Sequence, residues 1–166
     1  KIDIWLCQTA YGWLTGGSLG VVLEDHEKTL LYAQRLNHFA RELGCIGLDF
    51  DWEFPPTARQ AQGYRELMQE SKRLGMKVSV CAIQPTVDKA YQDNCFPDNA
   101  GVNNHEGKFM KWEEIIGKEM VDHINVMQYL GYNPKQKRMD VNVKYEKMGI
   151  WEKAYPDEFT STGKIK

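Results

Sequence analysis

The sequence predicts an α/β protein with a mostly parallel sheet. Short apolar segments typical of strands alternate along the 166 residues with longer segments of helical periodicity. Strands separated by helices form βαβ units, whose strands run parallel. No repeat, linker or low-complexity segment interrupts this alternation, so we expect one domain over residues 1–166. Two closures remain open: a small doubly wound sheet, or part of a (β/α)8 barrel, which usually takes about 250 residues.

The first strand is expected over residues 2–7, where apolar side chains dominate. A loop rich in Gly and aromatic residues follows it. Asp25 is a suitable N-cap for a helix that runs to Leu43 and that Gly44 ends. The apolar face expected for this helix consists of Leu36, Phe39, Ala40 and Leu43.

The second strand is expected over residues 46–53 and ends before Pro55 and Pro56. Thr57 and Gln60 have the spacing of a capping box for the next helix. The residues expected on the buried face of that helix are Ala61, Tyr64, Leu67, Met68 and Leu74, and Gly75 ends it.

The second half of the chain continues the alternation around a long loop over residues 84–108. The short basic segment over 135–138 is expected to be a solvated loop, and residues 163–166 resemble the start of another strand. The other expected elements are a strand over 77–83, a weaker helix over 111–120, a strand over 123–130 and a helix over 141–153.

Composition limits the function. The chain is 42% hydrophobic and 27% charged with a net charge of −2, which is typical of a globular domain and argues against nucleic acid as a partner. No apolar run approaches the roughly 20 residues that span a bilayer, so no membrane partner is expected. The chain starts at Lys1 without Met or a signal peptide, which indicates a processed or trimmed end.

Cysteine and histidine spacing gives no sign of a metal site. The cysteines lack CxxC pairs, and the four histidines form no HExxH pair. We expect no metal and no cofactor, and we expect the cysteines to be small buried hydrophobic residues rather than disulfide or zinc ligands. They are Cys7, Cys45, Cys81 and Cys95.

The strand over 46–53 alternates apolar with acidic residues. Ile46, Leu48, Phe50 and Trp52 fall on one face, and Gly47, Asp49, Asp51 and Glu53 on the other. Neighbouring acids lie about 7 Å apart along such a strand. Carboxylates facing inward cost free energy unless they share protons or hydrogen bonds, which indicates a functional role.

Two other interpretations of this pattern stay open. The acids could form the solvated face of an edge strand, or a site for Mg²⁺ or Ca²⁺. The helices expected on both sides of the strand and the position of the acids toward its carboxyl end favour an active site.

The fourth strand shows a related pattern. Its polar face carries His123, Asn125, Met127 and Tyr129. A lone Tyr is more often a core residue with a satisfied hydroxyl. Two strands with inward polar groups nevertheless predict a shared pocket.

The segment from Gly47 to Pro55 resembles the D-G-x-D-x-D-x-E signature of family-18 chitinases, and Met127-Gln128-Tyr129 is similar to their M-x-Y element. The resemblance implies a (β/α)8 barrel, incomplete in this chain, which carries about strands three to six as a fragment of a longer catalytic domain. The departures are Ile46 in place of the first Asp, Cys7-Gln8-Thr9-Ala10 in place of S-x-G-G, and Leu130 where Asp often follows the Tyr.

The resemblance implies retaining hydrolysis of β-1,4 linkages between N-acetylglucosamine (GlcNAc) units, in which the 2-acetamido group of the substrate attacks the anomeric carbon. Glu53 would be the general acid and base. Asp51 would hold the acetamido N–H, Asp49 would share a proton with Asp51, and Tyr129 would donate to the acetamido oxygen. The implied partner is a GlcNAc-containing oligo- or polysaccharide, and the implied location is extracellular.

Alternatives remain for both substrate and class. The same mechanism serves endo-β-N-acetylglucosaminidases that cut N-glycan cores, and the family also contains chitin-binding lectins, which typically lose the catalytic Glu. A doubly wound phosphotransfer or nuclease domain is disfavoured because the glycine frame from Gly12 lacks the Lys of a phosphate loop.

Further contacts are expected around this site. Met127 is assigned to substrate binding, and Trp13 and Phe96 are the aromatic residues expected to stack on sugar rings. Strands missing from the barrel would leave unpaired edges, which predicts association with chains that supply them.

Overall fold

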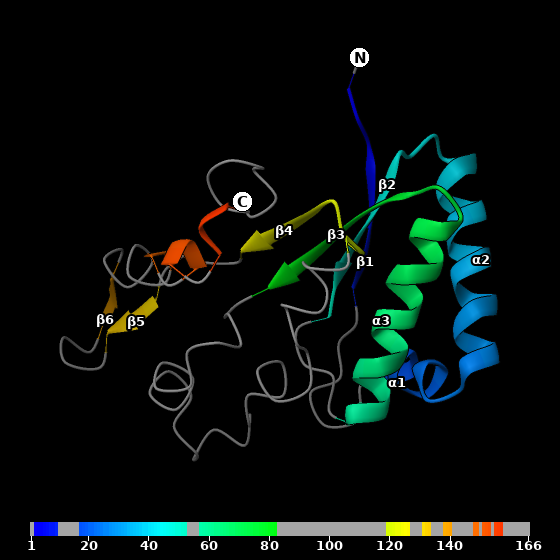
Figure 1. The fold of residues 1–166 in the computed structure, drawn as a ribbon, viewed down its shortest axis with the longest axis horizontal. Helices are drawn as coiled ribbons and strands as arrows, with labels where there is room; N and C mark the ends of the chain where they lie inside the picture. Colours follow the sequence, from blue (N-terminus) through cyan, green and yellow to red (C-terminus); the bar gives the residue numbers. More distant parts are fainter. Residues whose placement is uncertain are drawn as a thin grey trace.

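The computed structural model describes residues 2–9, 17–52, 57–82, 119–126, 131–133, 138–140, 148–149, 151–153 and 155–157. Within these residues a four-stranded parallel sheet carries helices on one face (Figure 1). The strands lie side by side in chain order: β1 (Trp5–Thr9), β2 (Gly47–Asp51), β3 (Lys77–Ala82) and β4 (His123–Val126).

The strand order distinguishes between the two closures. A doubly wound sheet reverses its order at a switch point, whereas a barrel adds each strand beside the previous one. The four strands described in the sheet show no reversal. The order of the described strands therefore favours the barrel type within the α/β class.

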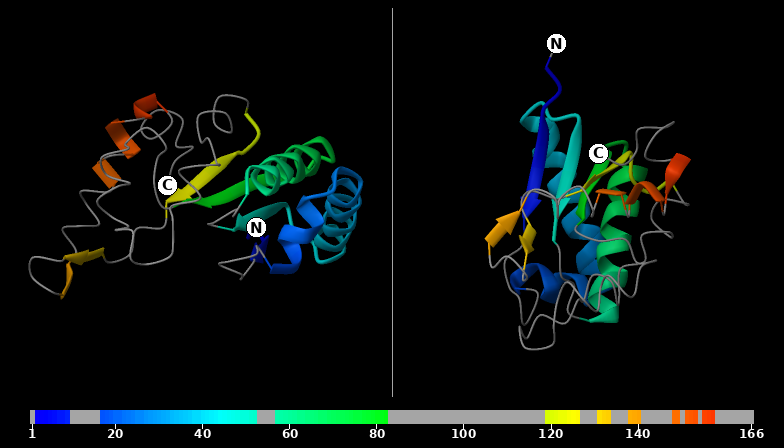
Figure 2. Two further views of the ribbon diagram at one scale, coloured as in Figure 1. Left: turned by 90° about the horizontal axis from the view of Figure 1, so that it is seen from below. Right: turned by 90° about the vertical axis from the view of Figure 1, so that its left-hand side faces the viewer.

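Three helices form the covering layer: α1 (Gly17–Leu23), α2 (His26–Glu42) and α3 (Ala58–Arg73). Figure 2 shows α2 and α3 side by side against the sheet in both views. Both ends of α2 follow the prediction. The Asp25 carboxylate accepts a hydrogen bond from the Lys28 N–H at 3.0 Å, and the helix end at Gly44 has a φ of 74° that favours glycine.

The capping box predicted for α3 forms only in part. The Thr57 hydroxyl accepts the Gln60 N–H at 3.1 Å, as expected. The Gln60 side chain, however, donates to Glu24 Oε1 at 2.7 Å instead of contacting the N-cap residue. It thereby links α3 to the segment after α1, a helix that the sequence did not predict.

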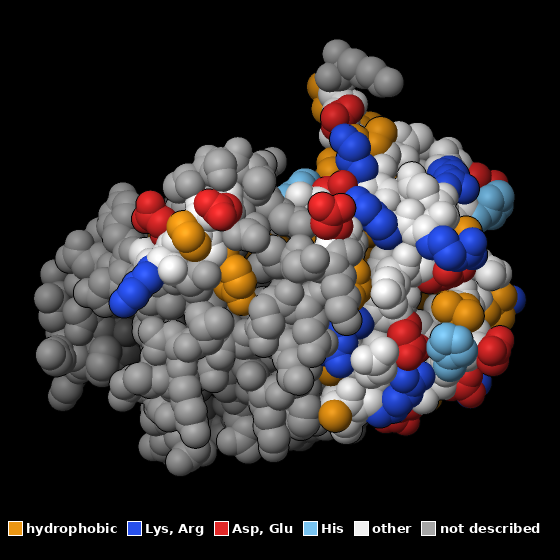
Figure 3. All heavy atoms as spheres, in the orientation of Figure 1, with side chains coloured by type: hydrophobic (Ala, Val, Ile, Leu, Met, Phe, Trp, Pro, Cys, Tyr) orange, Lys and Arg blue, Asp and Glu red, His pale blue; other side chains and the backbone are white. Residues whose placement is uncertain are grey.

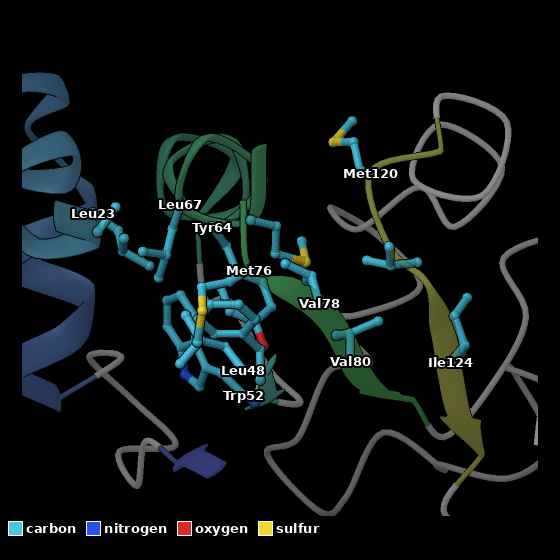
Figure 4. Packing of buried hydrophobic residues seen from close by; sticks show 14 of the residues in the cluster. Leu23, Leu48, Trp52, Tyr64, Leu67, Met76, Val78, Val80, Met120 and Ile124 are labelled. Atoms are coloured by element: carbon cyan, nitrogen blue, oxygen red, sulfur yellow. Dashed lines mark hydrogen bonds between the residues drawn. The ribbon is translucent and has the colours of Figure 1, made fainter. Parts of the chain in front are cut away.

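The hydrophobic core lies between the sheet and α3. Leu48, Phe50, Val78, Val80 and Ile124 are fully buried on the helix-facing side of the strands. Figure 4 shows α3 packed above several of them. The predicted face of α3 is confirmed for the four residues that are fully buried: Ala61, Tyr64, Leu67 and Met68.

The predicted face of α2 is confirmed only in part. Ala40 is fully buried and Leu36 packs against the core, whereas Phe39 and Leu43 are 51% and 53% exposed. Ala33 and Asn37, which were not predicted on this face, are buried. The reason is close packing of α2 on α3, which small residues permit. Asn37 Nδ2 donates to Ser71 Oγ of α3 at 3.0 Å, so a buried polar pair fixes the rotation of the helix.

The last part of the chain differs from the prediction in two places. Strands β5 (Gly131–Asn133) and β6 (Arg138–Asp140) pair antiparallel, and β6 begins within the segment predicted as a solvated loop. Glu119 and Met120 are not helical, and the rest of the helix predicted over 111–120 lies outside the described residues. Helical residues at 151–153 fall within the predicted last helix.

Among the described cysteines, Cys45 and Cys81 are buried as predicted and Cys7 is exposed, contrary to prediction. All three are free thiols, and Cys95 lies outside the described residues. Figure 3 shows Lys, Arg, Asp and Glu side chains spread over the helical side of the molecule. In the described part of the chain, no helix has the length and hydrophobicity to cross a membrane.

Candidate active site

The alternation predicted for β2 is present. Leu48 and Phe50 are fully buried toward α3, while Asp49 and Asp51 are partly buried on the opposite face of the sheet. The parallel register places Cys7 of β1 and Ser79 of β3 at the level of Asp49. The acids therefore lie on a face shared with polar groups of neighbouring strands.

Asp49 is the centre of a hydrogen-bond network across three strands. Its Oδ1 accepts hydrogen bonds from the Ser79 hydroxyl and, at 3.0 Å, from Asn125 Nδ2. Its Oδ2 accepts the Cys81 thiol at an S···O distance of 3.6 Å. Asn125 therefore lies on the same face of the sheet as Asp49, as the alternation of β4 predicts, and the network holds the Asp49 carboxylate in one orientation.

Asp51 has a different environment. Its Oδ1 is buried and accepts no hydrogen bond from the residues that the structure describes. Burial raises the pKa of Asp51, and the negative charge of Asp49 raises it further. The two neighbouring carboxyl groups therefore have different environments. Asp49 accepts hydrogen bonds from several donors, whereas the surroundings of Asp51 favour its protonated form.

Two thiols complete the surroundings of Asp49. Although the Cys7 side chain is exposed, partial desolvation raises its pKa to about 11, and the charges of Asp49 and Asp51 add to the effect. The same causes, in the same order, raise the pKa of Cys81. Both thiols are therefore protonated at neutral pH, which suits them as hydrogen-bond donors to Asp49 and not as nucleophiles.

The face carrying these groups is closed at the amino ends of the strands. The rings of Trp5 on β1 and His123 on β4 lie 4.9 Å apart between centroids. Three strand spacings would separate β1 from β4 by about 14 Å in a flat sheet, so the face is concave. Gly47 permits this arrangement, because a Cβ there would lie within 2.9 Å of three atoms of the Trp5 ring.

We predict that Asp51→Asn raises the stability of the protein at neutral pH. The raised pKa means that the folded state binds the proton more tightly than the unfolded chain does. The free energy of unfolding therefore falls as pH rises from the unfolded pKa, ordinarily 3.8, through the folded pKa. Asparagine carries no such charge. The urea concentration at the midpoint of unfolding should therefore be higher for Asp51→Asn than for the unaltered protein at neutral pH, and this difference should shrink toward pH 4.

The control for this change is Asp3→Asn, which removes an exposed carboxylate remote from the site. Its midpoint should stay close to that of the unaltered protein at each pH. An Asp51→Asn midpoint equal to or below that of the unaltered protein at neutral pH would contradict the prediction.

The other predicted site residues lie outside the described residues. They are Glu53, Tyr129, Met127, Trp13 and Phe96. Ser79, Cys81 and Cys7 were missed as parts of the site. A signal existed for the first two, because alternation along β3 puts Ser79 and Cys81 on one face and Val78 and Val80 on the other.

The described acids do not form a metal site with their neighbours. Within the described part of the chain, no group of three or more His, Cys, Asp or Glu residues could hold a metal ion. Uncharged or protonated donors surround Asp49 instead. This arrangement suits proton handling between carboxyls.

The sequence model described as "Glycosyl hydrolases family 18" matches residues 11–157. The chain belongs to this family. The match includes both described acids and the segment around Tyr129, so the resemblance seen in the acidic strand is confirmed. No curated protein sequence matches this family member closely enough to count as a relative.

Solved structures similar to this family-18 chain include chitinases. The family-18 chitinase from the chitin utilization locus of Flavobacterium johnsoniae is 17% identical with a TM-score of 0.60, and the match covers 99% of this chain and 47% of that chain. The class V chitinase of Nicotiana tobaccum is 16% identical with a TM-score of 0.58 and the same coverage. Catalytic domain 2 of the Ostrinia furnacalis group II chitinase is 16% identical, with a TM-score of 0.57 and coverages of 99% and 44%.

These similarities establish the fold. The family-18 chain described here spans about half the length of the chitinases that it matches. Its four-stranded parallel sheet is accordingly part of the barrel of this family, as the strand order indicates.

Proposed function

We propose that this family-18 chain forms the catalytic part of a retaining glycoside hydrolase that cleaves β-1,4 linkages between GlcNAc units. One observation carries the proposal. Asp49 and Asp51 lie on a concave face, where Asp49 is held by Ser79 and Asn125 and Asp51 has a raised pKa. The chain continues from them directly to Glu53.

In the proposed reaction Glu53 protonates the leaving oxygen and later activates water. The substrate acetamido group is the nucleophile, which makes this family an exception to the use of two enzyme carboxylates. Asp51 holds the acetamido N–H and stabilises the positive charge that develops on the ring. Tyr129 donates its hydroxyl to the acetamido oxygen.

The two described acids suit this division of roles. A proton on Asp51 can be shared with Asp49, because the charge of Asp49 and burial both favour protonation of Asp51. When positive charge forms on the substrate, Asp51 can turn to its acetamido group, while the donors from β3 and β4 keep Asp49 in place.

Chitin-type oligomers are the proposed substrates. A solved glutamine-for-glutamate variant of the tobacco class V chitinase is in complex with NAG4, and a variant of the Ostrinia furnacalis chitinase domain is in complex with a chitin oligomer. The presence of Glu53 argues against a lectin. An extracellular location, as the family resemblance implies, belongs to this proposal.

The test is release of a fluorophore from chitobiose and chitotriose glycosides, with an N-glycan core substrate alongside. We expect release from the chitin-type glycosides and little cleavage of the N-glycan core. Cleavage of the N-glycan core alone would reassign the substrate. Binding of chitotriose without release from any substrate would support the lectin.

Additional strands, in the same longer polypeptide or in a partner chain, are proposed to complete the barrel. Among the described strands, β1 and β4 each pair on one side only. Ile2 and Ile4, which lead into β1, are 88% and 52% exposed. We predict that the 166-residue chain alone self-associates in sedimentation velocity, and a well-folded monomer would contradict this prediction.

A further inference from the structure

The end of β2 is held from the helix layer by Tyr64 of α3. The backbone N–H of Trp52 donates a hydrogen bond to the Tyr64 hydroxyl oxygen at 3.2 Å. The described pairing with β3 ends at Phe50, and the pairing with β1 ends at Asp51. A side chain from another layer therefore accepts the N–H at the point where β2 leaves the sheet.

Tyr64 is itself held rigidly. The residue is fully buried, and its ring meets those of Phe50 and Trp52 edge-on, with centroids 6.0 and 5.3 Å apart. Figure 4 shows Tyr64 packed with Trp52 and Leu48 beneath α3. A hydroxyl in such surroundings has a defined position, so it can define the position of the backbone that it binds.

Glu53 follows Trp52 directly in the chain. A peptide unit is planar, so fixing the Trp52 N–H fixes the orientation of the peptide that joins Asp51 to Trp52. Only the two backbone dihedrals of Trp52 then separate this fixed plane from the next peptide. We propose that Tyr64 is a positioning residue, which sets the direction in which the chain leaves β2 and thereby the position of the Glu53 carboxyl group.

This role depends on the proposed hydrolase function. Its first test is therefore one that can be read without turnover of a substrate. Tyr64→Phe keeps the ring and removes the oxygen that accepts the Trp52 N–H. We expect native-state hydrogen exchange at the Trp52 amide, followed by NMR, to become at least about tenfold faster relative to the amides of β3. The control is Tyr32→Phe in α2, whose side chain is partly buried against the same core and should leave Trp52 exchange unchanged.

The second test uses the chitotriose glycoside. A displacement of about 1 Å in a catalytic group can lower a rate roughly 100-fold, so Tyr64→Phe should lower kcat about 10- to 100-fold with KM little changed. The limb of the kcat–pH profile that reports Glu53 should also shift. A mere loss of folded protein would lower the rate without moving that limb.

The outcomes separate the two proposals. Unchanged Trp52 exchange in Tyr64→Phe overturns the positioning role, whatever the activity. Faster exchange with unchanged kcat and pH profile also overturns it, because the strand end would then be loosened without effect on Glu53. If the unaltered protein cleaves no substrate, the proposed function fails, while faster exchange would still show that Tyr64 holds the end of β2.

Discussion

Replacing Glu53 by Gln is expected to abolish turnover of GlcNAc oligomers and to leave sugar binding intact. Glutamine has nearly the same shape but can neither donate the proton that the leaving oxygen needs nor take one from water. General acid–base catalysis contributes roughly 10²- to 10⁴-fold, so the rate of fluorophore release should fall by at least about 10²-fold. The dissociation constant for chitotriose, measured by calorimetry, should stay about the same.

The matched control for this variant is Glu152→Gln. Glu152 is exposed and lies remote in sequence from β2, so the same chemical change there should leave the rate unaltered. Undiminished turnover in Glu53→Gln would exclude Glu53 as the acid and with it the assignment of the reaction. Loss of chitotriose binding together with activity would indicate that the variant disturbs the site as a whole.

The predictions that hold are those that depend on the geometry of a single element. A strand alternates its side chains between two faces whatever surrounds it, so the placement of Asp49, Asp51 and Asn125 could be predicted from spacing alone. Helix caps are equally local. Asp25 and Thr57 bind the N–H groups of their own first turns, as expected from their residue types.

The predictions that fail depend on contacts between elements. Phe39 was assigned to the buried face of α2 because it is apolar, yet the helix turns small residues and Asn37 toward α3. The pairing of Asn37 with Ser71 joins residues far apart in the chain, and no periodicity within α2 reports it. Gln60 shows the same limit, since its side chain prefers Glu24 to the local cap.

The candidate site likewise combines features that one strand predicts with features that depend on contacts between strands. Its acids could be found from one strand, but the groups that hold Asp49 come from β3 and β4. Their approach depends on the register between strands, which a strand sequence does not specify by itself. The difference in environment between Asp49 and Asp51 likewise arises only when the neighbouring strands are in place.

The second large effect is expected from Gly63→Ala in α3. A Cβ at Gly63 would lie 2.8 Å from the carbonyl carbon of Leu23 and 2.9 Å from its Cβ, with the carbonyl oxygen closer still. Two of these atoms belong to the backbone at the end of α1, so relief requires a shift of the whole helix and not of one side chain. Overpacking of this kind costs about 1–3 kcal/mol.

Helix propensity acts in the opposite direction at this position. Alanine favours a helix interior over glycine by up to about 1 kcal/mol. The sign of the change in stability therefore reports whether α1 and α3 are in contact.

Gly149→Ala is the matched control, because Gly149 is helical and a Cβ there meets no atom within 4 Å. Thermal unfolding should show Gly149→Ala unchanged or slightly stabilised. Gly63→Ala should melt several degrees lower, at about 2–4 °C per kcal/mol for a domain of this size. An equal or higher melting temperature for Gly63→Ala would show that α1 does not pack on α3 at this point.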